Sequence, residues 1–385
     1  MKITGVESVL LSAPLSEDSA TRWSGGEMTV ASVSMLLVHT DAGIVGLGDT
    51  YAGGWFYPEA AGAVAKHFSG VLVGENPLNV ALLTERMRAS CKYWGRVGAA
   101  INVISAIENA LWDIAGQEAG VPAWKLLGGL AQERMPYYAS AGQEKPADAL
   151  EREMAGYVRD KVPAVKIRVS TNLDRAVEKV ETCRRLLGPD IQIMVDAVMG
   201  SHPKPWDRKT AIRFAKAIDR YDITWLEEPC AADDYEGLAE VRRESPVPIS
   251  GGETTFGLIE FGHFLKAGSL DIVQPDACTS GGMLECMRIA AAASLFGVRV
   301  APHAWGSGAT VMANVHWSFT QPNIMVQEIP TWGFPLRDAL LVEPIRFDGG
   351  HILPPTAPGL GLKLTQEIRD AYPWRGGYGA TVRAA

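Results

Sequence analysis

Ionisable side chains recur at nearly even spacing along the second half of the sequence. The successive intervals are 30, 31, 26, 23, 27 and 25 residues, and the series consists of Lys166, Asp196, Glu227, Glu253, Asp276, His303 and Glu328. Carboxylates supply the hard oxygen ligands that divalent cations prefer, and an imidazole takes up or releases a proton near neutral pH. If folding brings these residues together, they can bind a metal ion and transfer a proton.

Each of these residues lies in, or directly after, a short apolar segment. The first of the eight segments is MPYYAS at 135–140, the last is NIMVQEIP at 323–330, and amphipathic helical patterns separate them. This alternation predicts a parallel (β/α) barrel, whose strands end at one mouth where active sites lie. An acidic residue after a strand is often a helix N-cap, but that role does not explain the whole series. A doubly wound sheet is the alternative, and the lack of a G-x-G-x-x-G motif after the first strand disfavours it.

The N-terminal third of the sequence has a different pattern. Residues 1–46 alternate like a small antiparallel meander, and helical periodicity follows over 58–69, 77–90 and 99–119. Strands followed by helices predict an α+β lobe. We therefore predict an α+β capping domain at residues 1–125, a barrel domain at 126–355 and a C-terminal segment at 356–385 that packs back on the capping domain.

Composition narrows the class of protein. The chain has 385 residues, 47% of them hydrophobic, with a mean hydropathy of +0.03, which predicts a globular protein with a sizeable core. A net charge of −8 without a basic run disfavours nucleic acid and anionic membranes as partners. The N-terminus lacks the features of a signal peptide, so we predict a cytoplasmic location. The five cysteines are scattered, which predicts reduced thiols rather than disulfides or a zinc site.

Several motifs are similar to those of one enzyme family. They are ALWDIAGQEAGVPAWKLLGG at 110–129, VKIRV at 165–169, MVDA at 194–197, WLEEP at 225–229, SGGE at 250–253, VQPDA at 273–277 and PHAWGSG at 302–308. Through them nearly the whole chain resembles the enolase superfamily, in its mandelate racemase and muconate lactonizing branch. The resemblance implies an α+β capping domain over a (β/α)7β barrel. It also implies Mg²⁺-assisted abstraction of the proton α to a carboxylate in a small-molecule substrate, by a homo-oligomer.

The resemblance assigns the metal ligands. Asp196, Glu227 and Glu253 match the family's three ligands, whereas Glu228, the second glutamate of the EEP motif, is not expected to bind the ion. The chemistry agrees with this assignment, because Mg²⁺ held by three carboxylates keeps open positions for water or for a substrate carboxylate.

Proton transfer is expected of His303, because an imidazole needs little tuning to act at neutral pH. The resemblance implies that Asp276 hydrogen-bonds this imidazole, fixes its tautomer and raises its basicity. It also implies that Glu328, at the end of the eighth strand, is a carboxylic acid that donates a hydrogen bond to the enolate oxygen. A surface position is the alternative for Glu328.

Lys166 and Arg168 are two residues apart on one strand, so their side chains point to the same face. We expect both to hold the substrate carboxylate and to stabilise the enolate; the alternative is one buried ion pair and one solvated cation. Arg168 departs from the Lys-x-Lys motif of racemase-type relatives, and its high pKa makes it a poor base. His303 alone can remove the α-proton and then protonate the departing β-hydroxyl. The departure therefore predicts a Mg²⁺-dependent sugar-acid dehydratase that forms a 2-keto-3-deoxy acid.

Other functions fit the same residues less well. The first alternative is an isomerase, either an epimerase or racemase or a sugar-acid lactone cycloisomerase, in which Lys166 is the second acid-base group. A metal-dependent aldolase and a non-catalytic binding protein are further alternatives. The His303–Asp276 pair disfavours the aldolase, and the complete set of ligands disfavours the binding protein.

Substrate specificity is expected to come from two loops of the capping domain. The first contains Arg22 and Trp23, the second contains Tyr51 and Trp55, and a pair of glycines beside each loop would permit motion. Packing between the lobe and the barrel is the alternative role for the aromatic residues.

One segment of the barrel departs from the family pattern. Val198 replaces the asparagine of the common Asp-x-Asn sequence, which removes a polar contact to the substrate. The following residues, 200–207, form a lengthened segment that is predicted to be an exposed turn because it contains two prolines. The alternative is that His202, Lys204 or Trp206 reaches the barrel mouth.

Overall fold

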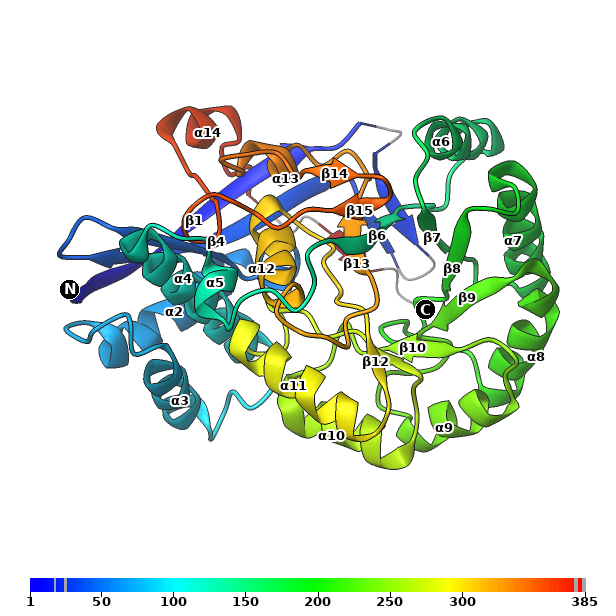
Figure 1. Cartoon of the computed structure of the whole chain (residues 1–385), viewed down its shortest axis with the longest axis horizontal. Coiled ribbons are helices and arrows are strands. Elements are labelled where there is room, and N and C mark those ends of the chain that lie inside the picture. Colours follow the sequence, from blue (N-terminus) through cyan, green and yellow to red (C-terminus); the bar gives the residue numbers. More distant parts are fainter. Residues whose placement is uncertain (17–18, 24–25, 377–379, 383–385) are drawn as a thin grey trace.

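A capping lobe and a barrel make up the fold, and helices surround the barrel (Figure 1). The computed structural model describes the chain at residues 1–16, 19–23, 26–376 and 380–382. The side chains of residues 21–23, 26, 52 and 380–382 lie outside this description. No helix among the described residues is long and apolar enough to cross a membrane.

The capping lobe is an antiparallel sheet against which helices pack. Its strand order is β1–β4–β5, and the register pairs Val9 with Met35. Its main elements are β1 (Ile3–Pro14), β4 (Val30–Thr40), β5 (Val45–Asp49), α2 (Pro58–Leu72), α3 (Val80–Cys91) and α4 (Ala99–Ala119). β5 approaches α4 closely at Gly48, where a Cβ atom would lie 1.9 Å from the carbonyl oxygen of Ala106. A side chain at this position would therefore separate the sheet from α4.

The barrel is a closed ring of parallel strands, as predicted. Its strands are β6 (Met135–Ser140), β7 (Ala164–Arg168), β8 (Gln192–Asp196), β9 (Ile223–Glu227), β10 (Ile249–Gly251), β11 (Ile272–Val273), β12 (Arg299–Val300) and β13 (Gln327–Pro330). Neighbours in the chain pair in parallel from β6 to β12. The ring closes because Val300 bridges to Ile324 and β13 pairs in parallel with β6. A doubly wound sheet has two edges, so this closure excludes that alternative.

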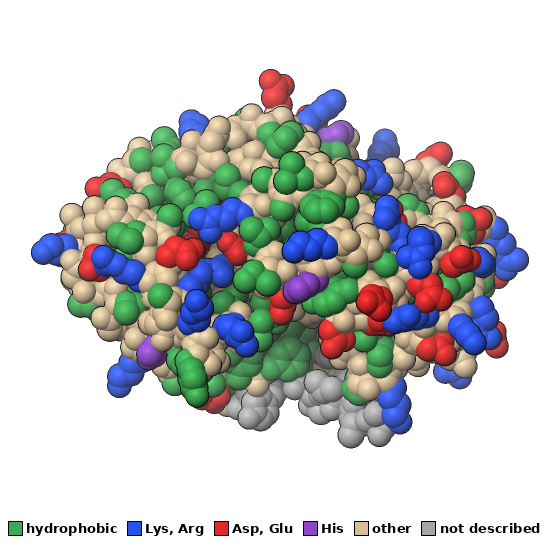
Figure 2. Space-filling model, turned by 90° about the horizontal axis from the view of Figure 1, so that it is seen from below, with side chains coloured by type: hydrophobic (Ala, Val, Ile, Leu, Met, Phe, Trp, Pro, Cys, Tyr) green, Lys and Arg blue, Asp and Glu red, His purple; other side chains and the backbone are tan. Residues whose placement is uncertain are grey.

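A helix of 10 to 15 residues follows each of the first seven barrel strands, whereas only the five-residue helix α13 (Pro335–Ala339) follows the last, which gives the (β/α)7β order. These helices are α6 (Ala147–Arg159), α7 (Leu173–Leu187), α8 (Arg208–Ile218), α9 (Tyr235–Glu244), α10 (Gly257–Ala267), α11 (Met283–Leu295) and α12 (Gly308–Ser318). Side-chain caps begin several of them; Asp207, for example, accepts a hydrogen bond from the backbone of Thr210. α12 is buried along its whole length. Figure 2 shows acidic and basic side chains interspersed on the face seen from below Figure 1.

Short elements connect the lobe, the barrel and the C-terminal segment. They are β2 (Thr21–Trp23), β3 (Gly26–Met28), α1 (Ala52–Phe56), α5 (Ala123–Leu126), η1 (Asp219–Tyr221), α13 (Pro335–Ala339), β14 (Phe347–Asp348), β15 (His351–Ile352), α14 (Gln366–Ala371) and β16 (Ala380–Val382). β16 pairs with β3 of the lobe, and Pro373 bridges to Leu11 of β1. The described part of the C-terminal segment therefore contacts the capping lobe.

Helix α4 of the lobe holds the loop that follows β11. The side chains of Asn102 and Asn109 donate hydrogen bonds to the carbonyl oxygens of Cys278 and Ala277, at 3.1 and 3.0 Å. Buried Glu108 accepts hydrogen bonds from two backbone N–H groups at the beginning of α11. These contacts fix the loop that contains Asp276, so the lobe contributes to the geometry of the barrel mouth.

We expect acid to destabilise the fold through His316 on α12. The ring is fully buried, and its Nδ1 accepts a hydrogen bond from the backbone N–H of Trp124 at 3.2 Å. Burial lowers the pKa of His316 from 6.5 to about 3. Between these two pH values His316 binds a proton in the unfolded chain but not in the folded chain. The folded state therefore loses stability as the pH falls below 6.5. From pH 7 to pH 5 the free energy of unfolding should fall by about 2 kcal/mol for this residue.

Urea titrations at the two pH values measure this effect. His316→Asn keeps an acceptor near the position of Nδ1 and does not titrate, so the difference between pH 7 and pH 5 should shrink by the same amount. An unchanged difference in the variant would assign the acid sensitivity to other residues.

Candidate active site

Three carboxylates converge at the barrel mouth. Asp196 and Glu227 are the last residues of β8 and β9, and Glu253 lies two residues beyond β10. One oxygen from each lies within 4.8 Å of the others, close enough to share one ion. Burial, together with the charge of Glu227, raises the pKa of Asp196, which means that a cation at this point would stabilise the cluster. The donor set consists of hard oxygens, so it fits a divalent cation such as Mg²⁺.

Lys166 lies beneath this cluster and is fully buried. Its Nζ is 2.5 Å from an oxygen of Glu227, 3.3 Å from Glu328 and 3.7 Å from Asp196. Burial alone would lower the pKa of Lys166, but these carboxylates raise it well above its usual value. The expected contact between Lys166 and the substrate carboxylate stays a prediction, because here the ammonium group pairs with carboxylates of the chain itself. The ammonium group is enclosed by three carboxylates, over the ring of Tyr138, and offsets part of their negative charge.

Arg168 is also nearly buried, but its guanidinium lines the cavity at the mouth. It lies over the ring of Trp305 at 4.1 Å and donates a hydrogen bond to the carbonyl oxygen of Ala141 at 3.1 Å. Its Nε is 3.6 Å from Asp196. The planar group is thereby held in one orientation beside the three carboxylates, where it can bind a substrate carboxylate with two hydrogen bonds.

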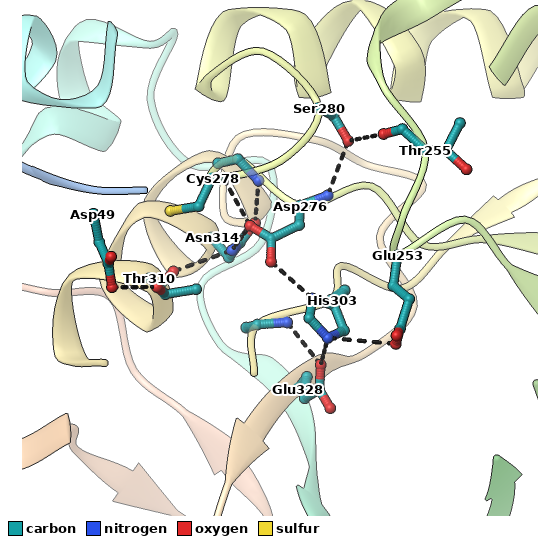
Figure 3. A network of polar contacts seen from close by, with 12 residues as sticks. Asp49, Glu253, Thr255, Asp276, Cys278, Ser280, His303, Thr310, Asn314 and Glu328 are labelled. Atoms are coloured by element: carbon teal, nitrogen blue, oxygen red, sulfur yellow. Dashed lines mark hydrogen bonds and ion pairs between the residues drawn. The ribbon is translucent and has the colours of Figure 1, made fainter. Parts of the chain in front are cut away.

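His303 and Asp276 form a hydrogen-bonded pair, as expected (Figure 3). The His303 Nδ1 lies 2.7 Å from Asp276, and its Nε2 lies 3.5 Å from Glu253. Asp276 is itself fixed by Asn314, which donates a hydrogen bond at 2.9 Å. Because a carboxylate only accepts hydrogen bonds, Nδ1 carries a proton toward Asp276, and in the neutral form of the ring Nε2 is the base that faces the cavity.

The surroundings of His303 favour its protonated form. Burial alone would lower the pKa of the imidazole. The negative charges of Glu328, Glu253 and Asp276 outweigh this effect and raise the pKa from 6.5 to about 9. These carboxylates would stabilise the imidazolium that forms when the ring accepts a proton from a substrate.

Glu328 differs from the expectation in position and in charge. It is the second residue of β13 rather than the end of the strand, and it is fully buried rather than on the surface. It accepts a hydrogen bond from the backbone N–H of Ala304 at 2.6 Å. Burial raises the pKa of Glu328, but Lys166 and His303 lower it to about 2. In this arrangement the carboxylate has no proton to donate, and its expected role as a hydrogen-bond donor to an enolate stays a prediction.

A cavity of about 180 Å³ lies above the cluster. Polar and charged residues form one part of its wall and apolar residues the other; the lining is Met28, Tyr51, Trp55, Phe56, Gln143, Arg168, Asp196, Val198, Ser201, Glu253, Thr254, His303 and Trp305. Two of the four residues predicted in the capping loops, Tyr51 and Trp55, therefore reach the site. The side chains of the other two, Arg22 and Trp23, lie outside the described residues.

Tyr51 packs closely against its neighbours in this structure. Its φ of 49° is strained for a tyrosine, and its ring contacts the edge of the His303 ring at 5.4 Å between centroids. The glycines that follow it lie in α1 and allow close packing: a Cβ atom on Gly54 would lie 2.7 Å from the carbonyl oxygen of Ser32. In this structure the absence of a side chain at Gly54 therefore allows α1 to pack directly against β4.

The segment 200–207 is only partly the exposed turn that was predicted. Lys204 is exposed, but Trp206 is buried and donates a hydrogen bond to the carbonyl oxygen of Thr171 at 2.8 Å. The ring of Trp206 packs against Phe214 of α8, so it anchors the turn to the outside of the barrel. The cavity is lined in this region by Val198 and Ser201 instead.

Several residues that support the site were not predicted. Gln274 and Trp225 donate hydrogen bonds to the same oxygen of Glu227, at 2.7 and 3.0 Å, and so orient this carboxylate. Gln274 lies two residues before Asp276 in the VQPDA motif, and the two-residue period of a strand was a signal that it faces the same way. Asn314, which fixes Asp276, lies on α12, and no pattern in the sequence marked it.

Asp49 at the end of β5 connects the lobe to the barrel (Figure 3). One of its oxygens accepts hydrogen bonds from Ser307 at 2.6 Å and from Thr310 at 2.9 Å, both near the beginning of α12. Its other oxygen accepts from the backbone N–H of Tyr51 at 2.9 Å. Burial raises the pKa of Asp49. This single side chain therefore fixes both the strained Tyr51 and the helix that carries Asn314.

A closed barrel with convergent carboxylates and a His–Asp pair at its mouth, under an α+β lobe, defines the class of barrel enzymes with an acidic metal site. Sequence models identify the family. The one described as mandelate racemase / muconate lactonizing enzyme, N-terminal domain, matches residues 9–128, and the one described as enolase C-terminal domain-like matches residues 149–368. The chain belongs to the enolase superfamily, in its mandelate racemase and muconate lactonizing branch.

Individual relatives cover nearly the full chain. A D-galactarolactone cycloisomerase of Agrobacterium fabrum is 31% identical over 383 residues, which are 95% of this chain and 97% of the relative. A D-galactonate dehydratase of Ralstonia nicotianae is also 31% identical and covers 88% of this chain and 92% of its own. A crystal structure of a member of the enolase superfamily from Polaromonas sp. JS666 has a TM-score of 0.89 and 30% identity, and covers 98% of this chain and 99% of its own. The relatives thus include both lyases and isomerases.

Proposed function

We propose that this protein is a Mg²⁺-dependent dehydratase of sugar acids. In the proposed reaction the proton α to the substrate carboxylate is removed, the β-hydroxyl leaves as water, and the product is a 2-keto-3-deoxy acid. Relatives named as dehydratases of galactonate, arabinonate and rhamnonate support this substrate class.

Asp196, Glu227 and Glu253 would hold the metal ion, and Arg168 would bind an oxygen of the substrate beside it. A bound Mg²⁺ supplies positive charge next to the substrate carboxylate, which makes loss of the α-proton easier. Lys166 supplies positive charge beside the buried carboxylates. These groups neutralise negative charge, but none of them moves a proton in the proposed reaction.

His303 performs both proton transfers. Its Nε2 takes the α-proton while Asp276 accepts the hydrogen bond from Nδ1–H and stabilises the imidazolium. The imidazolium then returns the proton to the departing β-hydroxyl, so that water leaves from the same face. No second base is needed, and the pair is regenerated after each turnover.

The observation that carries this proposal is that one proton-transfer group faces the cavity from the barrel. Among the described residues that line the cavity, His303 is the only histidine or lysine. Lys166 is enclosed by three carboxylates, and Arg168 retains its proton at neutral pH. A racemase or epimerase needs groups on both faces of the α-carbon, so elimination fits the site better.

A lactone or anhydro-sugar cycloisomerase is the second candidate. It is favoured by the 31% identity to a D-galactarolactone cycloisomerase and to a 3,6-anhydro-α-L-galactonate cycloisomerase. The same single base would serve, because opening of a sugar ring is also a β-elimination.

Incubation with a library of aldonic acids, aldaric acids and their lactones in the presence of Mg²⁺ tests the proposal. A product that is lighter than the substrate by one water and carries a keto group is the expected result. A product of unchanged mass would identify an isomerase. Return of deuterium to the α-carbon in D₂O, without a keto product, would point to an epimerase.

A further inference from the structure

We propose that Gln143 determines specificity by forming a hydrogen bond to a hydroxyl group of the substrate. This inference rests on the proposed function, because it requires a substrate with several hydroxyl groups. Gln143 belongs to the loop that follows β6, the first barrel strand, and it lines the cavity together with Arg168 and Val198.

The amide of Gln143 is buried without a partner. The residue is 3% exposed, and neither its Oε1 nor its Nε2 forms a hydrogen bond with any described residue. A buried amide that makes no hydrogen bond is unfavourable, and such groups occur where a ligand completes the site. The side chain therefore offers one acceptor and two donor hydrogens at the edge of the cavity.

The backbone around this residue is fixed from outside the site. The ammonium group of half-buried Lys179, on α7, donates hydrogen bonds to the carbonyl oxygens of Gly142 and Gln143 at 2.7 and 3.0 Å. The carbonyl oxygen of Gly142 also accepts from the backbone N–H of Arg168 at 3.2 Å. The loop is thus tied to two barrel units, and the amide is presented in a defined place rather than on a mobile loop.

The chemistry of the neighbours favours a hydroxyl as the missing partner. Arg168 and a metal ion held by the three carboxylates would already supply the positive charge that a substrate carboxylate needs. A neutral amide would therefore add little to carboxylate binding. Val198 offers only an apolar contact, although a sugar acid presents polar groups on both sides. A hydroxyl group both donates and accepts, as the amide does, and pairs with it without a change in charge.

Gln143 also lines a second cavity of about 170 Å³, together with Lys145, Glu153 and Trp332 among others. Water in this cavity is the competing partner for the amide. If water satisfied it, the residue would have a structural role, and the test must separate the two possibilities.

The test compares wild type with Gln143→Leu, which keeps the approximate volume and removes all hydrogen bonding. The readout is kcat/KM for the best acid from the library and for its deoxy analogues, each of which lacks one hydroxyl. Gln192→Leu is the matched control, because Gln192 is exposed at the opposite end of the barrel, where β8 begins. The thermal midpoint of each variant is measured without substrate.

We expect Gln143→Leu to lower kcat/KM for the full substrate by about 5- to 100-fold, as for loss of one buried hydrogen bond. For one deoxy analogue, wild type and Gln143→Leu should become equal, because the contact is already missing. The thermal midpoint of Gln143→Leu should equal or exceed that of wild type, since an unpaired buried amide is removed. Gln192→Leu should behave as wild type.

A wild-type kcat/KM in Gln143→Leu, or the same loss with every analogue, would overturn the inference while leaving the proposed function intact. A lower thermal midpoint with a uniform loss would assign Gln143 a structural role. If wild type converts none of the sugar acids, the proposed function fails, and this inference fails with it.

Discussion

Replacing His303 by asparagine should abolish the reaction, with a fall in kcat of at least about 10⁴-fold. The Nε2 of His303 is the base at the cavity, whereas an asparagine amide can keep the contact to Asp276 but cannot accept the α-proton. The decisive measurement is exchange of the α-proton in D₂O, followed by NMR, because it reports the first step even when no product forms. Exchange should be lost together with product formation.

His263→Asn is the matched control for this experiment. His263 lies on α10 with an exposed side chain, and its substitution should leave both exchange and turnover unchanged. Persistence of α-proton exchange at the wild-type rate in His303→Asn would show that another group removes the proton.

Replacing Glu253 by glutamine should weaken Mg²⁺ binding by more than about 100-fold and reduce turnover accordingly. Glutamine keeps the shape of the side chain but loses the charge that faces the ion. Glu253 is the best ligand for this test because, unlike Asp196 and Glu227, it makes no ion pair with Lys166, so its substitution leaves the charges around that lysine in place. Isothermal titration of the chelated, metal-free protein with MgCl₂ measures the affinity directly.

Glu236→Gln on α9 provides the control, since Glu236 is exposed and outside the cluster. Titration curves that coincide for wild type and Glu253→Gln would place the ion elsewhere or remove it from the mechanism. Loss of wild-type activity on chelation, with recovery on addition of Mg²⁺, is the complementary result that we expect.

The repeating part of the architecture could be predicted from the sequence because each βα unit carries its own local pattern. The apolar segments marked the strands, and the residue at or after each strand end marked the mouth. This logic brought Asp196, Glu227 and Glu253 into one cluster and Asp276 into contact with His303 at the same barrel mouth. A strand end is a local feature, and barrel closure converts several such features into one site.

Depth within the barrel could not be predicted in the same way. A two-residue period shows that Lys166 and Arg168 share a face, but it does not show which of them lies in the enclosed layer. In the structure Lys166 is enclosed, because carboxylates from three other strands surround it. The charge of Glu328 follows from the same enclosure, since its pKa depends on Lys166 and His303 rather than on its own segment.

The role of Gly54 was ambiguous for a different reason. Glycine serves both motion and close approach, and only the neighbours distinguish the two uses. Likewise, the hydrogen bonds that Asp49 accepts from Ser307 and Thr310 join residues more than 250 positions apart. No periodicity reports a contact at such a separation.

The link through Asp49 also bears on how such proteins can be recombined. In a chimera, the lobe of one relative is joined to the barrel of another. A foreign lobe would place another residue against Ser307 and Thr310. A foreign barrel without these hydroxyl groups would leave the buried carboxylate of Asp49 unsatisfied. Grafting a new lobe to change substrate preference should therefore succeed only when the first turn of α12 is transferred with it. In natural lineages, the two regions should diversify together rather than independently.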